Sequence, residues 1–307
     1  MPEFYGAAVG SKTDNRNPKP CHPTDMPLNA DEIEKHFRKL RKSIRKLRKR
    51  PTPEEVHDLR TRSRQVEASL QALMLENTGK GRKALKAVNP IRKRAGEVRD
   101  MDVLSELASG LTSEDQCRLR LIEYLSNQRL KGSAKLHRKA VRRRKDAERY
   151  LKGVSVRLKS QSDGNGSTEW PAEAAAVALQ LSGQLRRWPT LSAKNIHEFR
   201  KLAKQLRYVL KFSGEHDELV DSLGEVKDEV GLWHDWLELD QIAKKQLRHS
   251  GNCPVKREIR SNERRNFEKA LRDANRLRNQ YFPAGKRPQR RGKTPKPVLE
   301  AASKLAA

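Results

Sequence analysis

The sequence has few aromatic residues and no long hydrophobic segment. Aromatic residues make up 5% and hydrophobic residues 35% of the 307 positions. No stretch approaches the roughly 18 consecutive apolar residues of a membrane span, which argues against an integral membrane protein. The first 30 residues are polar and lack the apolar centre of a secretory signal. The alternation of polar and apolar residues that is typical of strands is also missing, so the sequence favours an all-α protein.

Cysteine is scarce as well. The three cysteines, Cys21, Cys117 and Cys253, are odd in number, far apart and free of C-x-x-C spacing. This pattern argues against a disulfide framework and against a zinc ribbon. We therefore expect a cytoplasmic protein, in a reducing compartment, with no resident metal or cofactor.

Acidic residues are too few to balance the basic ones. The chain has 67 Lys and Arg residues against 39 Asp and Glu residues, which leaves a formal net charge of +28. Such an excess costs stability through self-repulsion, so we expect it to serve the binding of a polyanion. Nucleic acid, an anionic membrane surface and polyphosphate all fit this composition, and only the positions of the charges can distinguish them.

Helical periodicity, by contrast, runs through most of the chain. Ile33, Phe37, Leu40, Ile44 and Leu47 are spaced by four and three residues in turn, which places them on one helix face. Similar patterns, bounded by proline and polar residues, predict eight helices. They are expected at residues 31–49, 53–76, 80–108, from 111 onward, 171–188, 192–213, 215–249 and 254–281.

Polar segments divide these helices into two sets of four. Residues 161–169 have the composition of a linker. The predicted organisation is a disordered N-terminal tail at residues 1–30, a first four-helix half at 31–160, the linker at 161–169, a second four-helix half at 170–282 and a basic disordered C-terminal tail at 283–307.

The two halves repeat each other in two places. Residues 56–70 (VHDLRTRSRQVEASL) align without gaps on residues 196–210 (IHEFRKLAKQLRYVL), and residues 96–100 (GEVRD) align on residues 231–235 (GLWHD). Two matches in the same order are far less probable by chance than one, so they indicate an internal duplication.

The first repeated segment carries a stripe of basic residues along one helix face, because its members recur every three or four positions. The stripes are His57, Arg60 and Arg64 in the first copy, and His197, Arg200, Lys204 and Arg207 in the second. Neighbouring cations ~5–6 Å apart on a helix repel one another unless an anion lies between them. The stripes therefore predict an anion-binding site, although most other Lys and Arg residues of the chain are expected simply to face water.

The remaining repeated residues are predicted to be structural. The apolar residues of the two segments should face the core: Val56, Leu59, Val66 and Leu70, and Ile196, Phe199, Leu206 and Leu210. Asp100 and Asp235 are suited to pairing with an arginine or holding a histidine. Trp233 and Trp236 are predicted to lie in the core rather than to stack on bases.

The segments VHDLR…SRQ, GEVRDMDVL, IHEFRKLAKQLRY and GLWHDWLEL, in this order, resemble the CHAD family, the conserved histidine α-helical domain. The resemblance covers about residues 31–282. It implies two four-helix bundles related by a pseudo-twofold axis, whose basic surfaces converge on a groove that binds inorganic polyphosphate. By the family's pattern, the residues of the two stripes form the anion site.

The first stripe departs from the expected pattern at one position. Glu67 stands where the second copy has Arg207 and where a basic residue is expected. The first stripe is therefore expected to bind more weakly than the second, unless Arg62 or the helix at residues 31–49 supplies the missing charge. Within that helix, Arg41 and Arg45 are the candidate polyphosphate-binding residues.

Three classes of function are compatible with these features. A non-enzymatic polyphosphate-binding protein is favoured, because arginine forks and lysine ammonium groups on several helices suit dense, repeating phosphate charge. Its histidines would add charge near pH ~6.5, so binding should tighten on acidification. A non-specific nucleic-acid-binding protein, using the basic helices and the C-terminal tail, is the alternative, but stacking aromatics are few.

An enzyme is the third class and is not expected. The sequence has no Walker loop, no acidic cluster suited to Mg²⁺ and no E-x-E-x-K strand of the triphosphate-tunnel hydrolases that accompany many CHAD relatives. The resemblance to some relatives points to association with polyphosphate or other storage granules, which the sequence leaves open. It also leaves the oligomeric state and the preferred polyphosphate length open.

Overall fold

The structure of the protein, a computed structural model, describes residues 30–72, 75–162, 170–211, 218–248 and 253–283. Within these ranges every regular element is a helix, which confirms the all-α prediction. The helices are α1 (Ala30–Lys46), α2 (Pro53–Ala72), α3 (Gly79–Ser109), α4 (Gln116–Ser162), α5 (Trp170–Arg186), α6 (Ile196–Lys211), α7 (Glu218–Gln246) and α8 (Pro254–Tyr281), with a 3₁₀ turn at Leu75–Asn77. The two predicted tails lie outside the described residues except for their inner ends, Ala30, which begins α1, and Pro283, which follows α8.

Each set of four helices buries its own apolar cluster. In the first set, the predicted faces of α1 and α2 are buried, including Phe37, Leu40, Val56 and Leu59. In the second set, the predicted face of α6 packs with α5, α7 and α8, and Trp233 lies in that cluster. None of the described helices combines the length and apolarity that membrane crossing requires.

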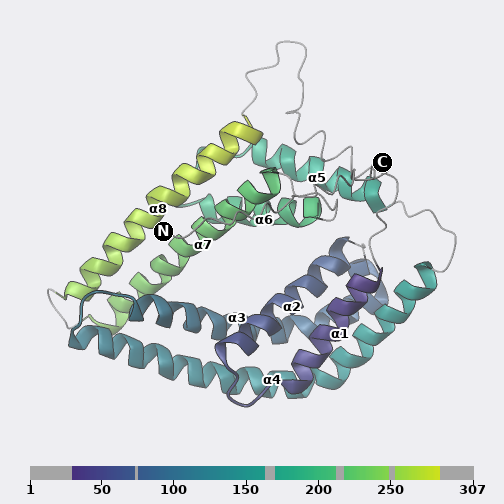
Figure 1. Cartoon of the computed structure of the whole chain (residues 1–307), viewed down its shortest axis with the longest axis horizontal. Coiled ribbons are helices and arrows are strands. Elements are labelled where there is room, and N and C mark those ends of the chain that lie inside the picture. The colour runs from purple at the N-terminus through teal and green to yellow at the C-terminus, as the bar shows by residue number, and fades with distance from the viewer. Residues whose placement is uncertain (1–29, 73–74, 163–169, 212–217, 249–252, 284–307) are drawn as a thin grey trace, which may run out of the picture.

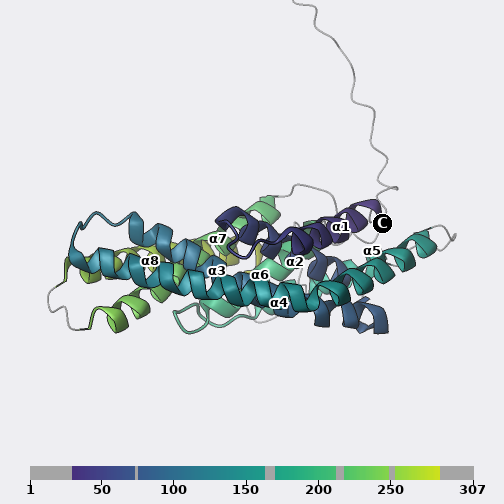
Figure 2. The same cartoon turned by 90° about the horizontal axis from the view of Figure 1, so that it is seen from below.

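A third apolar cluster belongs to both sets. The end of α3 and the start of α4 contribute Leu104 and Leu121, and the end of α7 and the start of α8 contribute Trp236 and Ile259. Figure 1 shows why: the ends of α3 and α7 and the starts of α4 and α8 lie together at the lower left, and from there the two sets diverge. In the view from below, α4 extends along most of the length of the molecule (Figure 2). The shared cluster therefore joins the two sets at one end.

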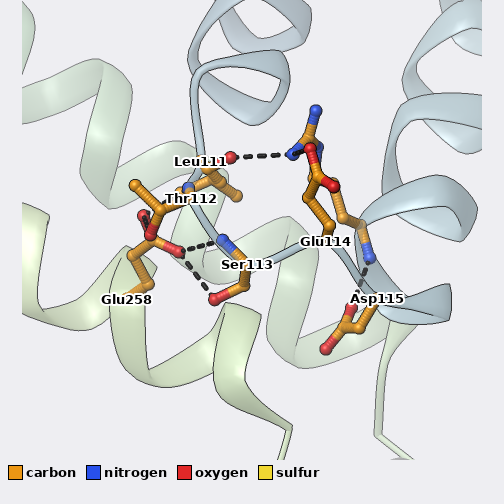
Figure 3. Close-up of polar contacts among 7 residues, drawn as sticks. Leu111, Thr112, Ser113, Glu114, Asp115 and Glu258 are labelled. Carbon is orange, nitrogen blue, oxygen red and sulfur yellow. Dashed lines mark hydrogen bonds and ion pairs between the residues drawn. The ribbon is translucent and has the colours of Figure 1, made fainter.

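A carboxylate reinforces this joint. Glu258 of α8 accepts four hydrogen bonds from the α3–α4 turn, namely from the backbone N–H and side-chain hydroxyl groups of Thr112 (2.8 and 2.9 Å) and Ser113 (3.0 and 2.8 Å) (Figure 3). Partial burial disfavours the charged form of Glu258. The four hydrogen bonds outweigh that effect and lower the pKa of Glu258 to about 2. The carboxylate thus stays charged at the joint throughout the physiological pH range.

The same turn explains one difference from the predicted helices. The fourth helix was predicted to begin at residue 111, but α4 begins at Gln116. Thr112 and Ser113 give their N–H groups to Glu258, and the carboxylate of Asp115 accepts the N–H of Arg118 at 3.0 Å, as an N-cap does.

The start of the sixth helix differs for a similar reason. It was predicted at residue 192, but α6 begins at Ile196. The side chain of Asn195 accepts the N–H of Ser192 at 2.9 Å and donates to the carbonyl of Thr190 at 2.8 Å, so these residues form a turn instead.

Glu258 should stabilise the protein through its charge. We predict that Glu258→Gln lowers the free energy of unfolding by about 1–2 kcal/mol at pH 7, because a half-exposed set of charge-assisted hydrogen bonds is weakened. The folded pKa is about 2 and the ordinary value is 4.5, so the contribution is complete above pH 4.5 and declines as the pH falls toward 2. Urea denaturation of both proteins across this range measures it.

Glu114→Gln is the matched control. Glu114 lies in the same turn, its side chain is 87% exposed, and its carboxylate is 3.8 Å from the guanidinium of Arg118. Glu114→Gln should therefore change the free energy of unfolding little. Equal losses in the two variants, or a Glu258→Gln effect that does not change below pH 4.5, would contradict this role of the carboxylate.

Candidate anion-binding site

The predicted stripes lie on two helices that belong to different halves of the molecule. Helix α2 carries His57, Arg60 and Arg64, here called the α2 stripe. Helix α6 carries His197, Arg200, Lys204 and Arg207, here called the α6 stripe. Because the opposite face of each helix is buried in its own core, the rotation of each stripe about its helix axis is fixed.

In the second half, two arginines of the α6 stripe lie against the backbone of α7. The Nε–H of Arg200 donates to the carbonyl of Lys227 at 2.8 Å, and the Nε–H of Arg207 donates to the carbonyl of Val220 at 3.0 Å. Each acceptor lies four residues before a glycine, Gly231 or Gly224. The backbone of α7 therefore orients both guanidinium groups through one nitrogen each, and their terminal nitrogens keep further donors.

The two glycines are needed for this close packing. A Cβ atom at Gly231 would lie 2.7 Å from Nη2 of Arg200, and one at Gly224 would lie 2.9 Å from Nε of Arg207. Both distances are too short for non-bonded atoms. The first half has a looser counterpart, since a Cβ at Gly96 would lie 3.8 Å from Nε of Arg60. Gly96 and Gly231 are aligned positions of the sequence repeat, so the repeat preserves the contact between a stripe arginine and a helix glycine.

The stripes of the two halves act on each other electrostatically. Burial and, after it, the positive charges of Arg64, Arg200 and Arg60 together lower the pKa of Lys204 to about 7. Burial also lowers the pKa of Arg60, and the charge of Arg200 from the other half adds to this. The α2 and α6 stripes therefore converge, and their cations repel each other across the boundary between the halves.

The converging cations are not neutralised by contact with acids. Within the described ranges, none of Arg60, Arg64, Arg200, Lys204 and Arg207 forms an ion pair. Neighbouring cations on the same helices do: Arg62 contacts Asp58 at 2.7 Å on α2, and Lys201 contacts Glu198 at 2.7 Å on α6. In addition, Nε of Arg64 is buried without a hydrogen-bond partner. Among the cations of α2 and α6 whose side chains the structure describes, those that lack an acidic partner are thus the stripe residues.

Acidic residues do lie near the stripes, but at longer range. Burial raises the pKa of Asp100 to about 6, and the charges of Glu238 and Asp235 raise it too, whereas the charge of Arg60 opposes the shift. Burial likewise raises the pKa of Asp235, against the effect of Arg200. The predicted pairing of these aspartates with arginines is present as an attraction between charges, without an ion-pair contact.

The two stripe histidines have different environments. His57 is exposed, and its Nε2 lies 3.5 Å from the hydroxyl of Thr61. His197 is half-buried, its ring centroid is 4.9 Å from that of His234, and its Nδ1 is buried without a hydrogen-bond partner. Burial lowers the pKa of His197, and His234, Lys201 and Arg200 add to the effect. His197 therefore gains its charge at a lower pH than an ordinary histidine.

Several neighbours of the stripes were not identified from the sequence. His234 occupies the position that aligns with Arg99 in the repeat, and this alignment was the available signal for it. Lys227 supplies both a carbonyl for Arg200 and a positive charge near Lys204. Arg92 lies 3.3 Å from Glu67, so the acidic residue that interrupts the first stripe is neutralised from α3.

The two candidates of α1 show no link to the stripes. Nε of Arg45 pairs with Glu148 of α4 at 3.2 Å, and Arg41 is half-buried on the same helix. Arg62, the other suggested source of charge, is occupied by Asp58 and the hydroxyl of Ser43. Binding by Arg41 and Arg45 stays a prediction, and Arg92 is the basic residue that the structure places beside Glu67.

Comparison with known proteins agrees with this architecture. The fold is similar to that of PptA from Streptomyces chartreusis, with a TM-score of 0.57 and 13% sequence identity over 82% of this chain and 98% of that chain. A search of curated proteins finds no match. The family model of the CHAD domain matches residues 32–244, which include both stripes and both pairs of repeated segments. The chain therefore belongs to the CHAD domain family.

Proposed function

We propose that this protein binds inorganic polyphosphate, without hydrolysing it, in a basic groove between the α2 and α6 stripes. The observation that carries the proposal is the convergence of Arg60, Arg64, Arg200 and Lys204 from two halves with no acidic contact. CHAD domains are associated with polyphosphate binding in general, which supports the same conclusion.

The arrangement suits a phosphate polymer better than a single small anion. Each helix presents cations at successive turns, ~5–6 Å apart, so one chain of phosphates can contact several of them in turn. The Nε atoms of Arg200 and Arg207 are held by α7, which leaves their terminal nitrogens to donate to phosphate oxygens. Because one stripe comes from each half, a long polymer held by one half lies at high effective concentration for the other.

The environment of Lys204 also favours an anion. Its positive charge is disfavoured by burial and by the charges of three neighbouring arginines, and a bound phosphate would reverse that balance. Part of the electrostatic repulsion within the free protein would therefore be released when polyphosphate binds.

Substitution of two lysines on the same helix tests the proposal. We predict that Lys204→Gln weakens binding of long-chain polyphosphate about tenfold, or ~1.4 kcal/mol, because one charge-assisted contact is lost. The dependence of log affinity on log salt concentration should also become shallower by about one unit. Fluorescence anisotropy with labelled polyphosphate at several salt concentrations measures both effects, and orthophosphate in the same samples should stay at the level of a protein-free control.

Lys201→Gln provides the comparison, since Lys201 is exposed on α6 and its ammonium already contacts Glu198 at 2.7 Å. We expect its affinity to change less than about twofold. If both substitutions weaken binding equally, general surface charge and not the stripe binds the polymer.

Binding should depend on pH through Lys204. The free ammonium has a pKa of about 7, and a bound anion raises it, so binding takes up a proton above pH 7 and affinity falls as the pH rises. We predict that Lys204→Arg retains binding and flattens this decline between about pH 7 and pH 9, because arginine stays charged. Anisotropy titrations at constant ionic strength across this range provide the test.

The groups that titrate at lower pH should act in the same direction. Protonation of Asp100, with a pKa of about 6, removes a negative charge, and protonation of His197 adds a positive one. The parent protein and Lys204→Arg should therefore both still bind polyphosphate more tightly on acidification below about pH 6. An unchanged decline above pH 7 in Lys204→Arg would show that Lys204 is not the responsible group.

A further inference from the structure

A cluster of potential metal ligands lies at the joint between the two halves, away from the residues of the stripes. Cys117 is in the first turn of α4, Cys253 is the N-cap residue of α8, and Asp115 precedes α4. One ligand atom from each, two sulfurs and one carboxylate oxygen, lie within 4.8 Å of one another. Cys253 is far from Asp115 and Cys117 in the sequence, so only the packing of the α3–α4 turn on α8 brings it to them.

The cluster is partly shielded from solvent. Cys253 is 6% exposed, Cys117 is half-buried, and both thiols are free. Oδ1 of Asp115 accepts the N–H of Arg118, and its second oxygen points away from that bond (Figure 3). The backbone therefore holds the carboxylate in place while one of its oxygens stays available.

We propose that Asp115, Cys117 and Cys253 bind one Zn²⁺ ion that links the start of α4 to the start of α8. Two thiolates and a carboxylate form a ligand set suited to zinc, with water as the fourth ligand. Tetrahedral Zn–S bonds of about 2.3 Å place the sulfurs about 3.8 Å apart, so the three groups need to approach one another by about 1 Å or less.

The surrounding charges are compatible with this ion. Two thiolates and one carboxylate would leave a zinc site with a net charge of about −1. Arg118 donates to the carbonyl of Leu111 at 2.9 Å and supplies a positive charge on the same turn, shared with the exposed carboxylate of Glu114 at 3.8 Å. Glu258 binds the adjacent Thr112 and Ser113, so the metal would reinforce a contact that already exists.

Binding should release protons. An ordinary thiol is protonated at neutral pH, whereas zinc binds the thiolate. Zinc must displace such protons, and its affinity should therefore increase with pH. Because the ion would bind the folded protein at a joint between its halves, it should also raise the melting temperature.

Zinc titration of the full-length chain tests the site. The protein carries no affinity tag, is kept reduced with a phosphine, and contains Cys21→Ser, because Cys21 lies next to His22 outside the described residues. Competition with a chromogenic chelator should show one Zn²⁺ per chain, with tighter binding at higher pH. Adding Cys117→Ser or Cys253→Ser should each lower affinity beyond the roughly 10–100-fold that loss of an outer-shell group typically causes.

A second readout separates ligation from folding. Co²⁺ should give a thiolate-to-metal charge-transfer band in Cys21→Ser. The band should disappear when Cys117→Ser or Cys253→Ser is added. The metal-free circular dichroism and melting temperature of these variants should match those of Cys21→Ser. No uptake by Cys21→Ser, or equal uptake in all variants, would overturn the proposal. Formation of a Cys117–Cys253 disulfide in air, with no metal uptake under reducing conditions, would also overturn it.

Discussion

The repulsion among cations from two different helices is the interaction around which this structure is organised. Arg60 and Arg64 on α2 and Arg200 and Lys204 on α6 act on one another's pKa values, and none of them has an acidic contact. Isolated helices would turn or separate to relieve such repulsion. Here the apolar face behind each stripe is buried, so the free energy of packing opposes that relief.

The backbone of α7 adds a second constraint. Glycines at positions 224 and 231 allow Arg207 and Arg200 to lie against the helix, where backbone carbonyls accept their Nε–H groups. Neutral acceptors orient the guanidinium groups and leave their charge in place, whereas carboxylates would cancel it. The architecture therefore fixes the positions of the cations and keeps their charge available to a ligand.

The separation of the stripes depends on a distant part of the molecule. Since α2 and α6 belong to different halves, the apolar cluster shared by the ends of α3 and α7 and the starts of α4 and α8 sets how the halves diverge. Glu258 fixes the same turn with four hydrogen bonds. Changes at this joint should thus alter the anion site without touching its residues.

The all-helical fold, the buried faces and the placement of each stripe on one helix could be predicted from the sequence, because they follow from periodicity within one segment. Contacts between segments that are distant in the sequence could not be predicted in this way. Glu67 reads as an opposing charge until α3 places Arg92 beside it, and Arg45 reads as a free cation until α4 places Glu148 beside it. The proximity of Cys117 and Cys253 likewise depends on the joint, which no local pattern describes.

A competition between two polyanions tests the central claim most directly. Fluorescent duplex DNA is bound to the full-length protein and displaced with long-chain polyphosphate at matched phosphate concentration. Trp233 and Trp236 are buried, and Tyr208, whose half-buried ring lies 5.6 Å from the ammonium of Lys204, is a single stacking candidate beside the α6 stripe. Polyphosphate should therefore displace the DNA, and Arg200→Gln with Lys204→Gln should remove this advantage. If DNA instead displaces polyphosphate, or the double variant competes as the parent does, the converging stripes are not a polyphosphate site.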